Sequence, residues 1–261
     1  MPGERLSDPS LRRGIALAGG AARGFAHIGV LRAVEERGLD VSVVAGTSMG
    51  AIVGALWASG LGWEQILEIA RSTSWLRLID FRPRGGLLSP RKLREFLGRY
   101  LPDDFSGLVR PFAAVATDVV HGRSVYLHEG DLPSAVLASA AYPGLFPLIE
   151  RDGLQLTDGG VLDNLPVEAA RFLGAGWTLA SDVSYDPDRE NEPPAGLVEL
   201  GRRAVDLMQA RLTQVRLAMN PPDVYVRPDL AGIGLEHFGK LEEIWPRGYE
   251  AARAVLDEVE L

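Results

Sequence analysis

The chain contains 261 residues, of which 46% are hydrophobic and 24% are charged, a balance that is typical of globular proteins and excludes disordered and fibrous classes. It has no cysteine, which excludes a disulfide framework, a thiolate nucleophile and sulfur-ligated metal sites. The net charge of −8 argues against a nucleic-acid-binding protein, because neutralising phosphates needs a basic surface.

Strand-like runs alternate with helical patterns along the chain, which predicts an α/β fold with a mainly parallel sheet covered by helices on both faces. Residues 1–13 are interpreted as a polar tail, and residues 14–261 as a single domain. The expected strands are residues 14–18, 41–45, 112–116, 124–127, 154–156, 177–180 and 224–226. The expected helices are residues 28–38, 49–59, 63–72, 132–140, 166–173, 196–218 and 241–259.

The stretch from Val41 to Trp63 contains no charged residue and is long enough to be tested as a membrane span. Its first part has strand character and leads into a Gly-Thr-Ser-Met-Gly turn, so a buried strand, a tight turn and a buried helix are the better interpretation. The N-terminal segment lacks the apolar region of a signal peptide. We therefore expect a cytoplasmic protein.

Residues 19–24, Gly-Gly-Ala-Ala-Arg-Gly, lie between the first expected strand and its helix. A dinucleotide-binding fingerprint would need a glycine at Ala21 and an acidic residue at the end of the second strand, and the sequence has neither. An oxyanion hole built from backbone N–H groups fits this loop better. Close packing of the strand against its helix is the alternative.

Residues 46–50 form a Gly-x-Ser-x-Gly motif between the second strand and the next helix. Glycines two positions before and after the serine, Gly46 and Gly50, permit the sharp, strained turn that exposes a serine Oγ at the end of a strand. The following helix directs its N-terminus at the same point. The motif alone occurs equally often as a structural turn, but this context favours Ser48 as a nucleophile.

A third motif, Asp-Gly-Gly at residues 158–160, is by itself most often a turn, but it completes an ordered set. That set resembles the bacterial patatin-like phospholipases over nearly the whole chain. Its segments are residues 19–31, 46–51, 116–118, 139–147 and 158–160. The resemblance implies a three-layer α/β/α fold and a Ser–Asp dyad, without histidine, that hydrolyses acyl ester bonds of lipids. We expect no cofactor and no metal ion.

By match to the family motifs, Ser48 is expected to attack the ester carbonyl and Asp158 to accept its proton, so that an acyl-enzyme forms and water resolves it. Gly159 and Gly160 would let the backbone approach the nucleophile closely. Since an ordinary aspartate has a pKa of about 3.9, Asp158 must be partly desolvated to act as a base. The oxyanion hole is expected from the backbone amides of Gly19, Gly20, Ala21, Arg23 and Gly24.

The glycine-rich loop departs from the family at Ala21, since the family commonly has more consecutive glycines there. Alanine keeps the N–H donor but resists positive φ, so a hole that needs this conformation would be strained by about 1 kcal/mol or more. A catalytically idle lipid-binding or regulatory protein of the same fold is therefore the alternative function. Acyl transfer to an acceptor other than water is a close variant of the hydrolase.

The histidines offer an alternative to the dyad, because Ser48, Asp158 and His237 follow the chain order of an α/β-hydrolase triad. An exposed or capping role for His237 is the other interpretation. The remaining histidines are expected to pack near the site, in a hairpin turn and at a strand end: His27, His121 and His128.

Residues 73–110 form a long connection, which we interpret as a cap over the active-site mouth; a small satellite core is the alternative. Its apolar residues are Trp75, Leu76, Leu78, Ile79, Phe81, Leu87 and Leu88. We expect the segment from Trp75 to Phe81 to make transient contact with a membrane surface that carries the lipid or acyl-ester substrate. No nucleic-acid partner is expected.

Overall fold

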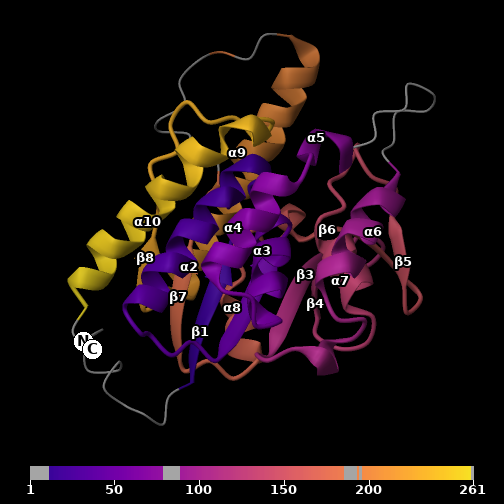
Figure 1. Cartoon of the computed structure of the whole chain (residues 1–261). Helices are drawn as coiled ribbons and strands as arrows, with labels where there is room; N and C mark the ends of the chain where they lie inside the picture. The colour runs from indigo at the N-terminus through magenta and orange to yellow at the C-terminus, as the bar shows by residue number, and fades with distance from the viewer. Residues whose placement is uncertain (1–11, 79–88, 185–192, 194–195, 260–261) are drawn as a thin grey trace.

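The computed structural model describes residues 12–78, 89–184, 193 and 196–259. An eight-stranded, mainly parallel sheet runs through the described residues, with helices on both of its faces (Figure 1). The strand order is β5-β6-β3-β2-β1-β7-β8, and β4 pairs with β3 beside this path. The predicted α/β fold with a mainly parallel sheet is confirmed.

Every strand expected from the sequence is present, with ends that differ by at most two residues. The strands are β1 Arg13–Leu17, β2 Val43–Thr47, β3 Phe112–Asp118, β4 Arg123–Leu127, β5 Ile149–Arg151, β6 Leu154–Asp158, β7 Trp177–Ser181 and β8 Val224–Val226. Only β5 lacks a counterpart among the predictions. It is three residues long and pairs antiparallel with β6, so it carries too short a pattern to be recognised.

The expected helices are also present, and several short ones join them. They are η1 Ala21–Phe25, α2 Ala26–Glu36, α3 Met49–Ala58, α4 Trp63–Ser72, α5 Trp75–Leu78, α6 Pro90–Tyr100, η2 Phe105–Gly107, α7 Leu132–Ser139, η3 Gly159–Val161, α8 Val167–Phe172, α9 Leu197–Met219, η4 Phe238–Lys240 and α10 Leu241–Asp257. Helices α5, α6 and η2 fall within the segment expected as a cap. The stretch tested as a membrane span forms β2, a turn and α3, as predicted.

The central strands bury side chains on both faces, which explains their nearly continuous apolar sequences. Val44 and Phe112 belong to the larger core, which includes residues of α2, α3 and α10. Val43 and Ala113 point to the opposite face and pack with Ala170 of α8. Two cores separated by one sheet confirm the three-layer α/β/α architecture.

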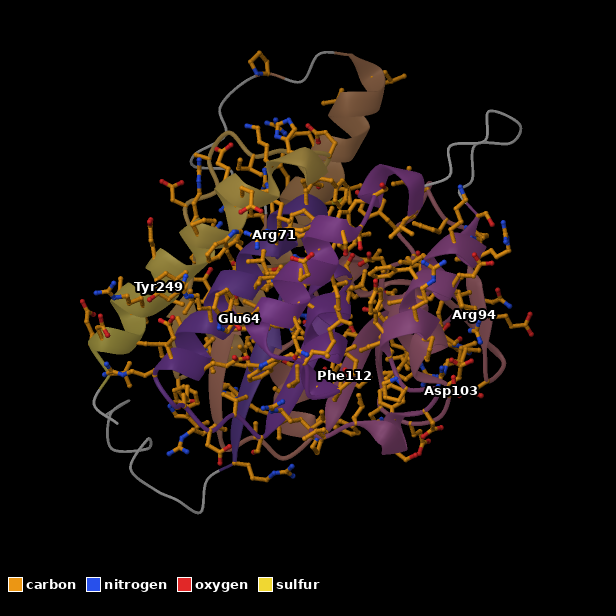
Figure 2. The ribbon with its side chains drawn as sticks, in the orientation of Figure 1. Glu64, Arg71, Arg94, Asp103, Phe112 and Tyr249 are labelled. Atoms are coloured by element: carbon orange, nitrogen blue, oxygen red, sulfur yellow. The ribbon has the colours of Figure 1, made fainter. Side chains whose placement is uncertain are left out.

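Helices α2 and α10 cross with their backbones in contact. A Cβ on Gly29 would overlap the Trp245 carbonyl, and a Cβ on Gly248 would overlap the Ala26 carbonyl. Tyr249 of α10, labelled in Figure 2, donates its hydroxyl to Glu36 of α2 at 2.6 Å. This crossing fastens α10 to the helix that follows the glycine-rich loop.

No helix in the described ranges combines the length and the apolar character that crossing a bilayer requires.

Candidate active site

Two strands meet end to end along one edge of β3, and this meeting creates the site. Thr47, the last residue of β2, pairs with Val115, and Asp158, the last residue of β6, pairs with Ala116. Both pairings lie on the same edge, because β4 occupies the other edge over these positions. Since β2 runs parallel and β6 antiparallel to β3, their final residues converge. Ser48, which follows Thr47, is thereby brought to Asp158.

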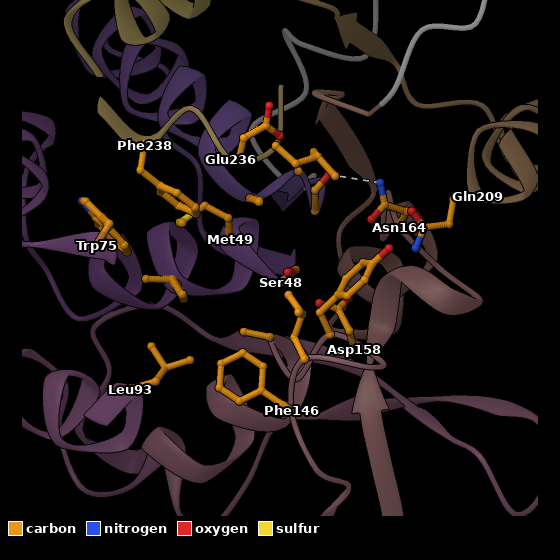
Figure 3. A pocket seen from close by; sticks show the side chains of 18 of the residues that line it. Ser48, Met49, Trp75, Leu93, Phe146, Asp158, Asn164, Gln209, Glu236 and Phe238 are labelled. Carbon is orange, nitrogen blue, oxygen red and sulfur yellow. Dashed lines mark hydrogen bonds between the residues drawn. The ribbon is translucent and has the colours of Figure 1, made fainter. Parts of the chain in front are cut away.

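Ser48 lies on a strained turn at the N-terminus of α3, with φ 54° and ψ −121°. The turn is so tight that it requires glycine at two positions. A Cβ on Gly46 would overlap the Gly50 carbonyl, and a Cβ on Gly50 would overlap the Leu17 carbonyl. The serine is half-buried and lines a pocket, and Figure 3 shows it beside Asp158. Its position is that of a nucleophile presented at a helix N-terminus.

Asp158 is buried, and its two carboxyl oxygens differ in their contacts. Oδ1 accepts the Gly160 N–H at 2.8 Å, whereas Oδ2 has no hydrogen-bond partner among the described residues. Burial raises the pKa of Asp158 to about 6, and the Ser48 hydroxyl and the Gly160 amide act in the lowering direction. A Cβ on Gly159 would overlap the Val115 carbonyl, so the glycine permits this close approach. The carboxylate has one anchored oxygen and one available to take a proton.

The last residue of α7 and the segment just after it hold the backbones of Ser48 and Asp158. Ser139 Oγ accepts the Ser48 N–H at 3.0 Å. The Ala141 carbonyl accepts the Asp158 N–H at 3.0 Å and the Thr157 hydroxyl at 2.8 Å. The sequence motif at residues 139–147 contains these residues, but without the fold it suggested no role for them.

The amides of the glycine-rich loop have different partners. The Gly19 N–H donates to the Asn164 carbonyl at 3.0 Å, and the Arg23 N–H donates to the Gly20 carbonyl at 2.9 Å. Both donors expected in the oxyanion hole are thus engaged within the fold, which corrects the expectation for them. Gly20 and Ala21 line the pocket, and among the described residues their amides have no partner. The candidate oxyanion donors therefore narrow to these two.

Gly24, also expected in the oxyanion hole, does not line the pocket and has a packing role. A Cβ on Gly24 would overlap the Met49 side chain, so the glycine lets η1 lie against the first turn of α3. Arg23 is also buried, and its Nε donates to the Ile233 carbonyl at 2.7 Å. The loop is thereby tied both to the serine turn and to a segment more than 200 residues away in sequence.

Ala21 adopts φ 45°, the left-handed conformation that alanine resists. Only Ser48 and Asp152 share a positive φ among the non-glycine residues that the structure describes. Gly20, in contrast, is extended at φ 176°. The backbone strain that the sequence predicted for an alanine in this loop is therefore present at Ala21 in the folded protein.

Asn164 and His27 support the loop, and the sequence motifs did not assign either role. The Asn164 Nδ2 donates to the Gly19 carbonyl at 3.1 Å and to Ser184 Oγ at 2.8 Å. His27 contacts the Ala18 carbonyl through Nε2 at 2.8 Å. Burial lowers the pKa of His27 to about 4, so the imidazole is neutral and holds the end of β1 in place.

The remaining histidines lie apart from the serine. No histidine lines the pocket in the described part of the chain. His237 Nδ1 accepts the Gly234 N–H at 2.9 Å, His121 pairs with Asp118 at 2.7 Å, and His128 contacts the Tyr126 carbonyl. Within these residues the geometry favours the dyad over a triad.

The pocket has a volume of about 410 Å³ and two dissimilar sides (Figure 3). Figure 3 places Trp75, Leu93 and Phe238 on one side of Ser48, and Asn164 and Gln209 on the other. The lining also contains further apolar residues, Ile52, Leu78 and Phe146, and further polar residues, Ser184, Asp206 and Glu236. Ser48 and Asp158 lie between the two sides. The described residues contain no cluster of three or more histidine, aspartate or glutamate side chains that could hold a metal ion.

The expectation of surface contact needs correction at Trp75. Its ring is half-buried and lies 5.2 Å from Phe25, 5.6 Å from Phe96 and 6.0 Å from Phe238, measured between ring centroids. The indole is therefore part of the pocket wall and the core beneath it. Four apolar residues of the expected cap lie outside the described residues: Ile79, Phe81, Leu87 and Leu88.

Comparison with known proteins gives a consistent result. The family model of patatin-like phospholipases matches residues 15–171. An uncharacterized NTE family protein of Mycobacterium tuberculosis is 39% identical over 195 residues, which cover 70% of this chain and 53% of that protein. Lysophospholipase NTE1 of Pyricularia oryzae is 31% identical over 270 residues, 91% of this chain and 18% of that protein. The chain thus spans about half, or less, of the length of these curated relatives.

The fold also has a counterpart among solved structures. VipD from Legionella pneumophila superposes with a TM-score of 0.62 at 14% identity, over 95% of this chain and 67% of that one. At this identity the likeness concerns the fold alone.

Proposed function

The chain belongs to the patatin-like phospholipase family, and we propose that it is a serine lipid acyl hydrolase in which Ser48 forms an acyl-enzyme and Asp158 is the general base. One observation carries this proposal. The Ser48 hydroxyl, presented on a strained turn, faces a buried carboxylate with an available oxygen at the wall of a largely apolar pocket.

The proposed reaction begins with attack of Ser48 Oγ on the ester carbonyl carbon while Asp158 takes the hydroxyl proton. The C–O bond to the alcohol then breaks, and the departing alkoxide receives that proton. Water attacks the acyl-enzyme, Asp158 takes a proton from it, and the carboxylic acid leaves as Ser48 recovers its hydrogen. A pKa of about 6 suits both steps, because the carboxylate is ionised near neutral pH and still retains basicity.

The negative charge on the tetrahedral oxygen needs donors at the moment of attack. We assign this role to the amides of Gly20 and Ala21, supported by the N-terminus of α3. Their freedom from other hydrogen bonds in the described structure supports the assignment, since no internal bond has to break first.

The two sides of the pocket suggest how the substrate lies. The acyl chain would lie among Trp75, Leu93 and Phe146, where its burial is favourable. The alcohol part of the ester would lie toward Asn164 and Gln209, which offer polar groups. A lysophospholipid fits this arrangement, and the name of the fungal relative, a lysophospholipase, agrees with it. The cytoplasmic location stays a prediction.

A fluorophosphonate probe tests the proposal. We expect one adduct per chain, mapped to Ser48 by peptide mass spectrometry, and hydrolysis of a short soluble ester that Ser48→Ala abolishes. Ser59→Ala, at the other end of the same helix, is the matched control and should retain both signals. Absence of labelling and turnover in a folded wild-type protein would instead support the idle lipid-binding alternative.

A further inference from the structure

Three polar side-chain atoms from separate parts of the chain converge around the Cα of Gly160. A Cβ at that position would lie 2.7 Å from Asn164 Oδ1, 3.1 Å from Asp158 Oδ1 and 3.1 Å from Gln209 Nε2. Asp158 ends β6, Asn164 lies between η3 and α8, and Gln209 belongs to α9. We call these three atoms, with Gly160, the Gly160 corner. Any residue other than glycine at position 160 would fill this corner with its own side chain.

The two amide side chains of the corner offer a hydrogen-bond donor and an acceptor. The Gly19 carbonyl can only accept, so it holds Asn164 Nδ2 toward itself and leaves Oδ1 as an acceptor in the corner. The Gln209 side chain lines the pocket and has no hydrogen-bond partner among the described residues. Neither amide is charged. The pair therefore suits a hydroxyl group, which donates and accepts at once, rather than a phosphate.

The corner lies on the side of Ser48 from which an alcohol would leave. Figure 3 places Asn164 and Gln209 on this side, opposite the apolar lining that would hold the acyl chain. In the proposed reaction Asp158 gives a proton to the departing alkoxide and later takes one from water. Because the same carboxyl serves both steps, the entering water oxygen takes the place of the alcohol oxygen. The corner faces that oxygen each time.

We propose that the Gly160 corner is the subsite for the alcohol oxygen and for the water that replaces it, and that Gln209 orients this water for attack on the acyl-enzyme. This inference rests on the proposed function and extends it to deacylation.

Hydrogen bonds to three partners would fix the direction of attack. The water donates one hydrogen to Asp158 and the other to Asn164 Oδ1, and it accepts from Gln209 Nε2, so its second lone pair is left to face the acyl carbon. The water oxygen bonds to that carbon while its proton passes to Asp158. The bond from the carbon to Ser48 Oγ then breaks, and Ser48 takes the proton from Asp158.

A p-nitrophenyl ester of a short fatty acid separates the two half-reactions. Its leaving group needs no proton, so acylation of Ser48 does not depend on the corner, whereas deacylation does. Release of p-nitrophenol in stopped flow measures acylation, and mass spectrometry of quenched protein measures decay of the acyl-enzyme. Gln209→Leu keeps the size of the side chain but removes its amide. It should slow this decay by about tenfold or more and leave acylation at the wild-type rate.

Two further variants complete the design. Gln209→Ala, which favours the helix, should show the same difference between the two rates. Gln214→Leu makes the same chemical change as Gln209→Leu at an exposed position of α9 outside the pocket lining, and it should leave both rates unchanged.

Equal slowing of both steps in the Gln209 variants would mean that Gln209 only supports the fold of the site, and the inference would be wrong. Decay at the wild-type rate in these variants, or equally slow decay in Gln214→Leu, would also overturn it. A folded wild-type protein that releases no p-nitrophenol would count against the proposed function itself, and the corner would lose its role with it.

Discussion

Asn164 forms hydrogen bonds with both backbone groups of Gly19, the N–H and the carbonyl. The Asn164 carbonyl accepts the Gly19 N–H at 3.0 Å, and the Asn164 side-chain amide donates to the Gly19 carbonyl at 3.1 Å. The two residues are 145 positions apart in sequence. This pair of bonds fixes the glycine-rich loop to the segment that follows Asp158, so the proposed oxyanion donors and the proposed base share one support.

Asn164→Ala is expected to lower kcat by about tenfold or more, because a loosened Gly19 lets the adjacent amides of Gly20 and Ala21 drift from the oxyanion. Asn164→Asp should be worse, since it replaces the donor with an anion beside a carbonyl. Steady-state kinetics on a soluble ester measures both. A change in KM with kcat preserved would contradict a positioning role.

Asp158→Asn is expected to lower kcat by about a hundredfold or more, since the amide cannot accept the Ser48 proton. His237→Ala should cost far less, because His237 contacts the Gly234 amide and does not line the pocket. Kinetics on the same ester compares them. Equal losses in the two variants would require a triad.

The rate is expected to depend on pH through Asp158. Its pKa of about 6 means that kcat/KM should fall about tenfold per pH unit below that value and level off above it. A pH–rate profile from pH 4.5 to 8 measures the inflection. An inflection near the ordinary value of 3.8 would show that the carboxyl is not desolvated in solution.

The same burial has a consequence for stability. The pKa of Asp158 in the folded protein lies above its ordinary value, so protonation of this carboxyl stabilises the folded state relative to the unfolded state. This contribution to the free energy of unfolding is complete below pH 3.8 and is lost as pH rises through about 6. Asp158→Asn, which stays neutral, should therefore unfold at a higher temperature than the wild type at pH 8 and show little gain at pH 4. Calorimetric melting at both pH values checks this, and a gain of equal size at pH 4 would contradict it.

Ala21→Gly is expected to stabilise the fold by roughly 0.5–1 kcal/mol, because glycine adopts φ 45° without the steric cost that alanine has there. The greater conformational freedom of glycine in the unfolded chain offsets only part of this gain. Ala22→Gly is the matched control in the same 3-10 turn. It relieves no positive φ and should destabilise the protein. Urea unfolding measures the change in the free energy of unfolding of each variant relative to the wild type. If both changes had the same sign, the strain at Ala21 would be contradicted.

Gly248→Ala is expected to destabilise the protein by about 1–3 kcal/mol or more, because its Cβ would overlap the Ala26 carbonyl at the crossing of α10 and α2. Gly98→Ala is a control on an exposed face of α6, where a Cβ meets no atom within 4 Å. That change should stabilise slightly through helix propensity. Thermal melting of the two variants decides whether the crossing is as close as described.

The sequence predicted the features that local patterns encode. The strand, turn and helix around Ser48 follow from apolar runs and two glycines, and α4 begins and ends where its pattern does. The conflict at Ala21 was also visible, because it depends only on the conformational preference of alanine. These features depend on neighbouring residues in the sequence, so long-range contacts in the folded protein do not alter them.

The features that the sequence missed depend on distant pairings. Ser139 meets the Ser48 amide, and Asn164 meets Gly19, across 91 and 145 residues. Such bonds also decide which backbone amides of the loop are free to act as oxyanion donors. The Gly19 amide, for example, already donates to the Asn164 carbonyl. Trp75 was expected at the surface because it lies in a long connection rich in apolar residues, but Phe238, more than 160 residues further along the chain, packs against it. No pattern within one segment contains this information.

The attachments of the glycine-rich loop also set the order in which the site matures on the ribosome. Ala22 donates to the Leu235 carbonyl, Arg23 to the Ile233 carbonyl, and Ala26 touches Gly248. A nascent chain that has already emerged past Asp158 contains the proposed nucleophile and base but lacks these attachments. At about 5–20 residues per second, several seconds separate the two stages. We therefore expect the proposed activity only after residues 233–248 have been made and have reached the glycine-rich loop.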